Sequence, residues 1–324
     1  MKYAALFIVF LAASGCIKND NRKVAVIASK TALPETSQTS LIILGTVQDA
    51  GSPHIACKKK CCSTLFEQGN SKRKVVSLGL LDAKNNKRYL FEATPDISEQ
   101  LKVLKTYGPD TQKETPDGVF LTHAHIGHYT GLMYFGKEAM NATKIPTYAM
   151  PRIKNYLKNN GPWSQLAEQQ NIELIEMTAD QPIQLSSNLN VTPFLVPHRD
   201  EYSETVAYTI SGPSKRALFI PDIDKWEKWK RPIVDEIKKV DYAFVDATFF
   251  SGAEINTRDI SEIPHPFVIE SMNSFDLLSS EEKSKIIFIH FNHTNPLLDP
   301  KSNETKEVLA KGFKIARAGD HYSL

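Results

Sequence analysis

The chain lacks an excess of charge of either sign, because 39 lysines and arginines stand against 37 aspartates and glutamates and leave a net charge of +2. A nucleic-acid partner is therefore not expected, since proteins that bind polyanions usually carry a strong positive excess. Beyond its first residues the chain also lacks an apolar run long enough to cross a bilayer. It has no repeat of fixed period and no low-complexity tract. Its hydrophobic content of 41% is that of an ordinary globular protein.

The N-terminus has the pattern of an export signal. A lysine precedes an apolar stretch at 3–13, and small residues lead to Cys16. This arrangement is typical of a secretory signal and not of a transmembrane helix. The Ala-Ser-Gly-Cys ending resembles a bacterial lipobox, although Ala13 stands where leucine is preferred. We predict a signal peptide over 1–16, a polar tether over 17–39, and an exported lipoprotein anchored to a membrane on the periplasmic or cell-surface side. A plain cleaved signal with an incidental cysteine is the alternative.

Short apolar runs bounded by turn residues recur from Ser40 onward, and each predicts a buried strand. Strands are predicted over 41–45, 75–81, 88–93, 119–121, 146–149, 172–177, 190–196, 205–210, 217–220, 242–246, 286–289 and 313–317. Helices are predicted over 97–107, 128–140, 225–239, 267–278 and 303–311, with another that begins at Pro151. Strands in runs, interleaved with helices, favour a single α/β domain over 40–324, with two sheets and helices outside them.

Histidine is scarce, yet three of the nine histidines lie within six residues, at His123, His125 and His128. They follow the apolar run 119–121. His123 and His125 are two residues apart, so in an extended turn their imidazoles point to one side. Neutral imidazole is the commonest metal ligand in proteins, and a catalytic zinc site uses several such ligands while it leaves one position for water. The cluster therefore predicts a metal centre.

Three more metal-binding side chains each follow a predicted strand by one or two residues. They are His198, Asp222 and His290. A buried strand delivers the residue after its last apolar position to the rim of the core. Together with the histidine cluster, these residues form an ordered series of six candidate ligands.

This series resembles the metallo-β-lactamase-fold superfamily, whose pattern is a His-x-His-x-Asp-His loop, then a histidine, an aspartate and a final histidine, each at a strand end. The resemblance covers 40–324 and implies an αββα sandwich, with two mixed sheets and helices on the outer faces. Within the superfamily, the chain resembles the pyrroloquinoline quinone biosynthesis protein B branch. The shared segments are Leu-Gly-Thr at 44–46, Gln-Asp-Ala-Gly at 48–51 with the cysteines that follow, Thr-Pro-Asp at 94–96, Leu-Thr-His-Ala at 121–124, and His290 with Thr-Asn-Pro at 294–296.

The resemblance implies a site for two metals. It assigns His123, His125 and His198 to the first metal, His128 and His290 to the second, and Asp222 to both. A hydroxide formed on these metals would be the nucleophile, and the metals would polarise the scissile carbonyl or phosphoryl oxygen. Asp222 and His128 are then the residues expected to act in catalysis. The implied protein is a metal-dependent hydrolase of a small-molecule ester, amide or phosphoester, with one or two Zn²⁺ ions, or with Fe²⁺ or Mn²⁺ in their place.

The chain departs from the family pattern at Gly127, where the family has the loop aspartate that binds the second metal. Glycine has no donor atom, so the second site loses a carboxylate. Either His293 or a water fills the vacancy, or the enzyme works with one metal. A one-metal site would suit iron and oxygen chemistry. An iron-dependent oxygenase resembling the pyrroloquinoline quinone relative, or a non-catalytic metal-binding protein, is therefore the alternative function.

Three of the four cysteines lie together, at Cys57, Cys61 and Cys62. With His54 they would form a closed four-coordinate zinc site, and the branch resemblance associates this position with a structural zinc. A disulfide with one thiol left over is the alternative in an oxidising exported compartment. The lysines at 58–60 are expected to lower the pKa values of the thiols.

Acidic side chains near the predicted ligands are expected to orient them. We assign this role to Asp96, with Glu92 as its rival. Asp224 either hydrogen-bonds a ligand or caps the helix that follows it, and we favour the cap, while Asp246 is another acid at a strand end or a turn residue. A small-molecule substrate is expected, and the oligomeric state stays open.

Overall fold

The computed structural model describes residues 38–68, 73–108, 112–255 and 260–324. These residues belong to one compact unit that extends over 34–324. The predicted signal peptide, with Cys16, lies outside the described residues. Among the helices that are described, none combines the length and the hydropathy that a membrane crossing requires.

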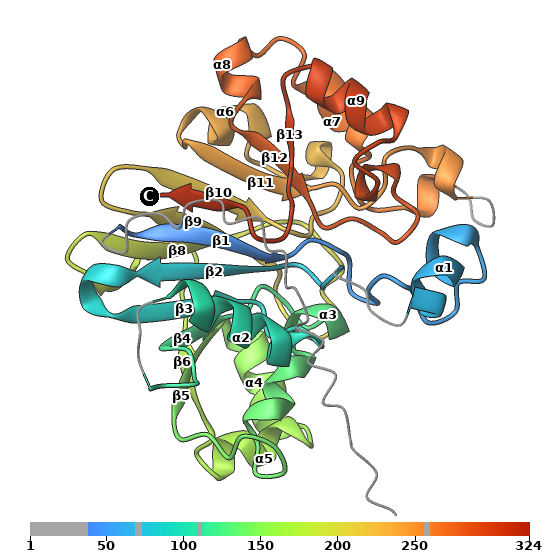
Figure 1. The fold of residues 1–324 in the computed structure, drawn as a ribbon. Coiled ribbons are helices and arrows are strands. Elements are labelled where there is room, and N and C mark those ends of the chain that lie inside the picture. The colour runs from blue at the N-terminus through green and yellow to red at the C-terminus, as the bar shows by residue number, and fades with distance from the viewer. Residues whose placement is uncertain (1–37, 69–72, 109–111, 256–259) are drawn as a thin grey trace, which may run out of the picture. The chain divides into compact units, whose positions relative to one another are not determined.

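Two seven-stranded sheets form the centre of the fold (Figure 1). In spatial order, the first sheet contains β14 (His321–Ser323), β1 (Ser40–Gly45), β2 (Ser77–Asp82), β3 (Lys87–Phe91), β4 (Gly118–Phe120), β5 (Ile145–Ala149) and β6 (Ile172–Glu176). The second contains β13 (Lys314–Ile315), β12 (Ile286–Ile289), β11 (Tyr242–Asp246), β10 (Arg216–Ile220), β9 (Val206–Ser211), β8 (Leu189–Leu195) and β7 (Ile183–Ser186). The last strand of the chain therefore returns to pair with the first.

Both sheets are antiparallel in one half and parallel in the other. Strands β1 to β3 pair as antiparallel neighbours, whereas β3 to β6 run parallel. In the second sheet β7 to β10 are antiparallel, whereas β10 to β13 run parallel. Parallel strands end at the same edge of a sheet, and ligands commonly bind outside these carboxyl ends. The polar residues that follow β4, β10, β11 and β12 are therefore placed to meet.

The space between the sheets is filled by buried aromatic and aliphatic side chains. Phe91 of the first sheet lies 5.3 Å from Tyr208 and 6.1 Å from Phe219 of the second, measured between ring centroids. Phe120 stacks on Phe91 at 5.0 Å. All four rings are fully buried, and burial of such a side chain contributes about 1.5–3 kcal/mol. This packing fixes one sheet on the other, and so it also fixes the edge that carries the polar residues.

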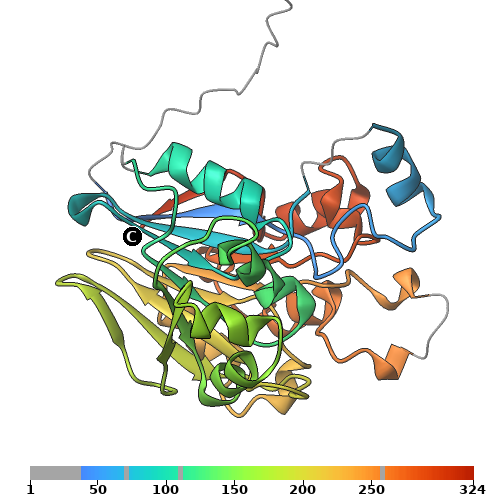
Figure 2. The same cartoon turned by 90° about the horizontal axis from the view of Figure 1, so that it is seen from below.

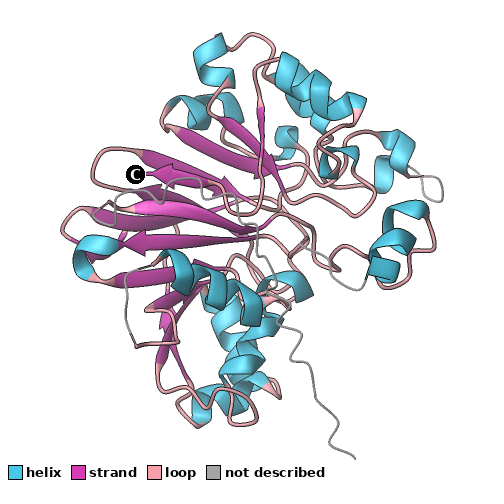
Figure 3. Cartoon of the chain, viewed as in Figure 1, coloured by secondary structure: helices cyan, strands magenta, loops and turns pink. Residues whose placement is uncertain are grey.

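Helices cover the outer face of each sheet, which confirms the predicted αββα sandwich (Figure 3). The helices over the first sheet are α2 (Ile97–Tyr107), α4 (Pro151–Asn159) and α5 (Trp163–Glu168), and those over the second are α6 (Ile233–Lys238), α7 (Val268–Ser274), α8 (Ser280–Lys283) and α9 (Asn303–Ala310).

The helix predicted over 128–140 is shorter and broken. It consists of α3 (Ile126–Tyr129) and the 3₁₀ helix η2 (Thr130–Phe135). Gly131 packs so closely on the chain that an added Cβ would lie 2.1 Å from the carbonyl oxygen of Thr94. A close backbone approach of this kind depends on tertiary contacts, and helical periodicity does not reveal it.

The helix predicted over 225–239 is also broken, into the 3₁₀ helix η3 (Trp226–Lys228) and α6. Pro232 stands before α6, where it has no N–H to continue a helix from the preceding turn. A further helix, α1 (Lys60–Gln68), was not predicted, because only one of its residues, Cys62, is buried and its apolar pattern is weak.

Candidate metal centre

The structure brings the six predicted ligands together at the carboxyl ends of the strands. They are His123 and His125 after β4, His128 in α3, His198 after β8, Asp222 after β10, and His290 after β12. The site therefore draws on both sheets, and the packing between the sheets sets the distances between the ligands.

Four of these residues form a first cluster. The Nδ1 atom of His125 lies 2.8 Å from Nε2 of His123 and 3.3 Å from Nε2 of His198. Asp222 Oδ2 lies 3.4 Å from the same nitrogen of His123 and 3.2 Å from that of His198. All four donor atoms lie within 4.8 Å of one another, which suits ligands about 2.1 Å from one cation.

A second cluster lies beside the first and contains His128, His290 and Asp49. Asp49 Oδ1 lies 2.8 Å from His128 Nε2. Asp222 Oδ2 is 3.9 Å from Nε2 of His128 and 3.9 Å from Nε2 of His290, so Asp222 stands between the two clusters. The prediction that His293 supplies a ligand here is corrected, because His293 lies with the cysteines.

The two clusters pass a simple test for a missing cation. Four of their atoms are buried and form no hydrogen bond with another described residue, although Asp49 Oδ1 and Asp222 Oδ1 each lie at ion-pair distance from an imidazole: Asp49 Oδ1, Asp222 Oδ1, His128 Nε2 and His290 Nε2. An unsatisfied buried polar group costs about 1–3 kcal/mol, so several of them at one place indicate a ligand that satisfies them. Imidazole nitrogens and carboxylate oxygens are the donors that zinc, iron and manganese accept. The residues therefore fit a metal centre.

Two acids, one buried and one partly exposed, lie beside the outer nitrogens of two histidines. Glu92 Oε1 lies 3.3 Å from Nδ1 of His128, and both side chains are 0% exposed. Asp224 Oδ1 lies 3.2 Å from Nδ1 of His198. Such partners fix the ring orientation and the tautomer of a metal-binding histidine.

Two assignments made from the sequence are thereby corrected. Asp96, expected to orient a ligand, instead accepts the backbone N–H of Val75 at 2.8 Å and lies 3.6 Å from the ammonium group of Lys74. Its rival Glu92 has the expected position. Asp224 is not the cap of η3, because Lys225 occupies that position.

Sequence reasoning missed His265, which lies between β11 and α7. Its Nδ1 lies 2.9 Å from Asp246 Oδ2 and 3.2 Å from Asp222 Oδ1. Asp246, at the end of β11, also receives the hydroxyl proton of Thr248 at 2.7 Å. His265 follows a proline-broken loop and not an apolar run, so no pattern in the sequence points to it.

Two buried residues of the site have a strained backbone. Glu92 has φ of 72° and His290 has φ of 68°. Residues other than glycine rarely occupy this left-handed region, and the cost is of order 1–3 kcal/mol each. The surrounding fold holds both residues in this state, which directs the two side chains toward His128 and toward the cluster.

Without a bound cation, protonated imidazoles offset the negative charges of the buried carboxylates. Burial alone would lower the pKa of His198, but Asp222 raises it to about 9. Burial opposes the charge on His128 as well, yet Glu92 and Asp49 raise its pKa well above the ordinary value. Protons on the imidazoles thus offset the buried carboxylates. A bound cation would replace these protons in the same role.

A pocket of 520 Å³ adjoins the second cluster, with Asp49, Val75 and Ile126 in its lining. Its size is that of a small-molecule site. A pocket of 590 Å³ lies elsewhere, against α4, α5 and β6, and contains none of the clustered residues. Of these two pockets, only the one at Asp49 contains a residue of the metal clusters, so it is the better candidate for a substrate site.

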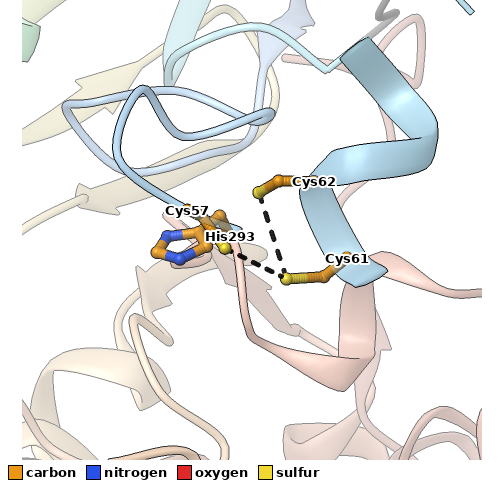
Figure 4. Close-up of side chains that lie close together, drawn as sticks. All are labelled: Cys57, Cys61, Cys62 and His293. Carbon is orange, nitrogen blue, oxygen red and sulfur yellow. Dashed lines mark hydrogen bonds between the residues drawn. The ribbon is translucent and has the colours of Figure 1, made fainter. Parts of the chain in front are cut away.

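The cysteines form a third cluster, with His293 as the fourth member (Figure 4). The sulfur atoms of Cys57 and Cys61 are 3.7 Å apart, and those of Cys61 and Cys62 are 3.9 Å apart. His54, predicted as the fourth ligand, instead packs against His293, with tilted rings whose centroids are 4.4 Å apart. The fourth position therefore belongs to His293.

Both views place α1 beside the segment that follows β12, and residues of both line one pocket (Figure 2). The cluster thus lies where two segments distant in sequence meet. Burial would raise the pKa of Cys57, but the backbone N–H and the charge of Lys59, with the neighbouring thiols, lower it, as the lysines were expected to do. Burial and the neighbouring thiols raise the pKa of Cys61 to about 12. Crowded thiols ionise together only when a cation compensates them. Their spacing matches the roughly 3.8 Å between two sulfurs bound tetrahedrally to one zinc, and all three are free thiols.

Comparison with known proteins gives a consistent result. The family model of the beta-lactamase superfamily domain matches residues 87–291. The coenzyme PQQ synthesis protein B of Methylorubrum extorquens (strain PA1) is 26% identical over 309 residues, which cover 86% of this chain and 98% of that protein. The protein of the same name from Xanthomonas campestris pv. campestris (strain B100) is 22% identical, over 88% of this chain and 99% of its own.

Solved structures show the same fold. Zn²⁺-bound PqqB from Methylobacterium extorquens aligns with a TM-score of 0.71 at 22% identity, over 88% of this chain and 100% of its own. A diphosphatase of the PhnP family aligns with a TM-score of 0.60 at 19% identity, over 89% and 97%.

Proposed function

Because the chain belongs to the beta-lactamase superfamily and resembles its PqqB branch, we propose that it is a metal-dependent hydrolase of a small-molecule ester, amide or phosphoester. The observation that carries the proposal is the position of Asp222 between two clusters of imidazoles. Such paired sites clamp the attacking and leaving oxygens of a displacement reaction. A single cluster without the second would not favour hydrolysis in this way.

The residues have separate tasks in this proposal. His123, His125 and His198 would hold one cation, and Asp222 would be shared with a second. Bound zinc supplies a Lewis acid and, near neutral pH, a hydroxide nucleophile. Asp224 holds the Nδ1 proton of His198, which leaves the Nε2 lone pair directed at the cluster.

The pocket beside Asp49 supports a small-molecule substrate. Its 520 Å³ falls within the usual range for such ligands, and its lining includes the apolar side chains of Val75 and Ile126. The near-zero net charge of the chain gives no support for a polyanionic substrate.

We further propose that Cys57, Cys61, Cys62 and His293 hold a structural zinc. Four protein ligands would close the coordination shell and leave no place for a substrate. The zinc would join α1 to the segment after β12. We also propose that the protein is exported and anchored by a lipid on Cys16, which stays a prediction from the sequence.

The test of the function begins with protein purified without added metal. Its metal content is measured, and zinc, manganese or iron is then restored for assays on p-nitrophenyl esters, a chromogenic β-lactam and bis(p-nitrophenyl) phosphate. We expect hydrolysis of at least one class with zinc or manganese. His198→Ala should lose both the activity and one bound metal, whereas His321→Ala, which changes a histidine that belongs to none of the clusters, should keep both. Full activity in His198→Ala would exclude the assigned site.

An iron-dependent oxygenase is the second candidate. The first cluster alone, with three imidazoles and a carboxylate, also suits iron that activates oxygen, and the curated relatives are named for PQQ synthesis. Oxygen uptake measured with an electrode, on iron-loaded protein and a reduced phenolic or quinone-like substrate, separates the two. Uptake that needs iron, together with no hydrolysis under zinc, would favour the oxygenase over the hydrolase.

A further inference from the structure

The glycine in the metal-binding loop has no room for a side chain. A Cβ atom added to Gly127 would lie 2.4 Å from Oδ1 of Asp49 and 2.5 Å from its Cα. Real Cβ atoms do not approach other atoms so closely. The space beside Gly127 is therefore filled by Asp49, which comes from the turn after β1 and not from the loop itself.

The carboxylate of Asp49 faces the second cluster. Its Oδ1 lies 2.8 Å from Nε2 of His128, the distance of an ion pair, and neither atom is assigned a hydrogen bond to another described residue. Nε2 of His290 is likewise buried and unpartnered. The three atoms lie within 4.8 Å of one another. Donor atoms that converge without bonding to one another are arranged for a shared cation.

The backbone that carries Asp49 is tied to the strand end that carries His290. The N–H of Gln48 donates to the carbonyl oxygen of Phe291 at 2.9 Å, and the N–H of Phe291 donates to the carbonyl oxygen of Thr46 at 2.8 Å. These bonds lie immediately before Asp49 and immediately after His290 along the chain. The carboxylate and the imidazole are therefore held in a fixed relation before any cation binds.

We propose that Asp49 supplies the carboxylate of the second metal, together with His128, His290 and the shared Asp222. In the superfamily pattern the loop aspartate at the position of Gly127 binds the second metal. In this chain the carboxylate comes from Asp49 in the turn after β1, and the absence of a side chain at Gly127 leaves the space that Asp49 occupies. This inference rests on the proposed metal centre, but it does not depend on whether that centre hydrolyses its substrate. It also reverses the expectation that the second site is short of a charge.

The test measures metal binding and not turnover. Metal-free protein is titrated with Zn²⁺ against a chromogenic chelator, and with Co²⁺ while the visible absorption is recorded. We expect Asp49→Asn to lose one tight metal relative to the unchanged protein, or to bind it about 100-fold more weakly, because the negative charge is removed and an amide oxygen is a weaker ligand than a carboxylate oxygen. The cobalt spectrum of the remaining site should persist.

Two further variants sharpen the test. Gly127→Ala should also weaken the second metal, because its methyl group must displace Asp49, although every ligand is still present. Asp82→Asn is the matched control: Asp82 is a buried acid, 1% exposed, whose carboxylate accepts from Asn85 in a turn, and its loss should leave the metal count unchanged. Circular dichroism of each metal-free variant shows whether it is folded.

The outcomes separate this inference from the proposed function. An Asp49→Asn protein that keeps every metal at unchanged affinity overturns the assignment of Asp49, whatever the activity. An unchanged protein that binds metal only through its cysteines overturns both the metal centre and the ligand. If two metals bind, one is lost in Asp49→Asn, and no substrate is hydrolysed, then the assignment of Asp49 stands and the hydrolase proposal fails.

Discussion

The buried carboxylate of Glu92 shows how a single residue can act on a metal that it does not touch. It lies 3.3 Å from Nδ1 of His128 and receives the N–H of Thr122 at 3.4 Å. Its charge keeps His128 in one orientation, with Nε2 toward Asp49. Such outer partners typically change metal affinity by about 10–100-fold when they are removed.

We therefore expect Glu92→Gln to weaken the second metal by about 10–100-fold, with a smaller effect on the first. Competition against a chelator of known affinity measures both. Asp96→Asn is the matched control, because Asp96 contacts Val75 and Lys74 and not a ligand. If Asp96→Asn weakens the metal as much as Glu92→Gln does, the orienting role of Glu92 is wrong.

Most residues of the metal centre could be predicted from the sequence, because the signal lies in the few residues around each of them. Six ligands follow apolar runs, so the end of each run predicts where a side chain reaches the rim of the core. Asp49 and His265 follow no such run, and their roles depend on contacts across the fold. In the sequence, Asp49 was noted only as part of a segment shared with the branch, and Gly127 suggested that the second metal lacks a carboxylate.

At the scale of elements, the cysteine cluster joins α1 to the segment after β12. Cys61 and Cys62 lie on α1, while His293 lies on the other segment. In the described residues, α1 has only Cys62 buried, so little apolar packing holds it. A cation shared by the two segments would therefore supply much of the attachment of this helix.

We expect His293→Ala to remove one metal and to lower the thermal midpoint, because the coordination shell is opened. His54→Ala is the control: the His54 ring packs against His293, 4.4 Å away between centroids, but His54 is not in the cysteine cluster, so the metal content of this variant should be unchanged. Metal analysis and calorimetry on both variants give the answer. Loss of metal in His54→Ala but not in His293→Ala would restore the assignment made from the sequence.

Asp117 joins β3 to β4 through charge. Its carboxylate accepts the backbone N–H of Arg88 at 2.9 Å and lies 3.1 Å from the Lys87 ammonium group and 2.8 Å from that of Lys113. Burial would raise the pKa of Asp117, but these three groups together lower it below the ordinary value. A folded-state pKa that is lowered means stability that is present above the unfolded-state pKa and lost as pH falls through the folded one.

Asp117→Asn should therefore lower the free energy of unfolding by about 1–2 kcal/mol at pH 7. The difference from the unchanged protein should shrink below pH ~4, where the carboxylate becomes protonated in the unfolded chain and then in the folded one. Urea unfolding of metal-free protein at pH 7 and at pH ~3 measures this. A difference of equal size at both pH values would show that charge is not the cause.

The elements themselves were predictable where they are buried on both faces. The strands at the centre of each sheet are continuous apolar runs, and their predicted bounds agree with β1, β10, β11 and β12 to within a residue. The edge strands β7 and β14 were missed, because they are short and half exposed. The helix break near Gly131 comes from close packing on the backbone of Thr94, and the break near Pro232 comes from the N–H that proline lacks. Hydrophobic periodicity reveals neither cause.

At the scale of the whole molecule, the two sheets are built alike, each with an antiparallel half and a parallel half. The metal centre lies where the parallel halves end, and it draws ligands from both sheets. Metal binding should therefore stabilise the sandwich as a unit, because a cation that binds only the folded chain adds RT ln(1 + [L]/Kd) to the free energy of unfolding. The ligands lie far apart in the sequence and meet only in the folded sandwich, so the sequence predicts them as an ordered series and not as one local motif.

The lipid anchor is the remaining prediction about the whole molecule, and it rests on the sequence that ends at Cys16. A lipid at this position would hold the domain at a membrane, because each buried methylene contributes about 0.8 kcal/mol. We expect the native protein to partition with membranes and to incorporate labelled palmitate, and Cys16→Ser to be released and unlabelled. Cys57→Ser makes the same chemical change inside the folded domain, so it should stay with the membranes. If Cys16→Ser fractionates as the native protein does, the prediction of a lipid on Cys16 is wrong.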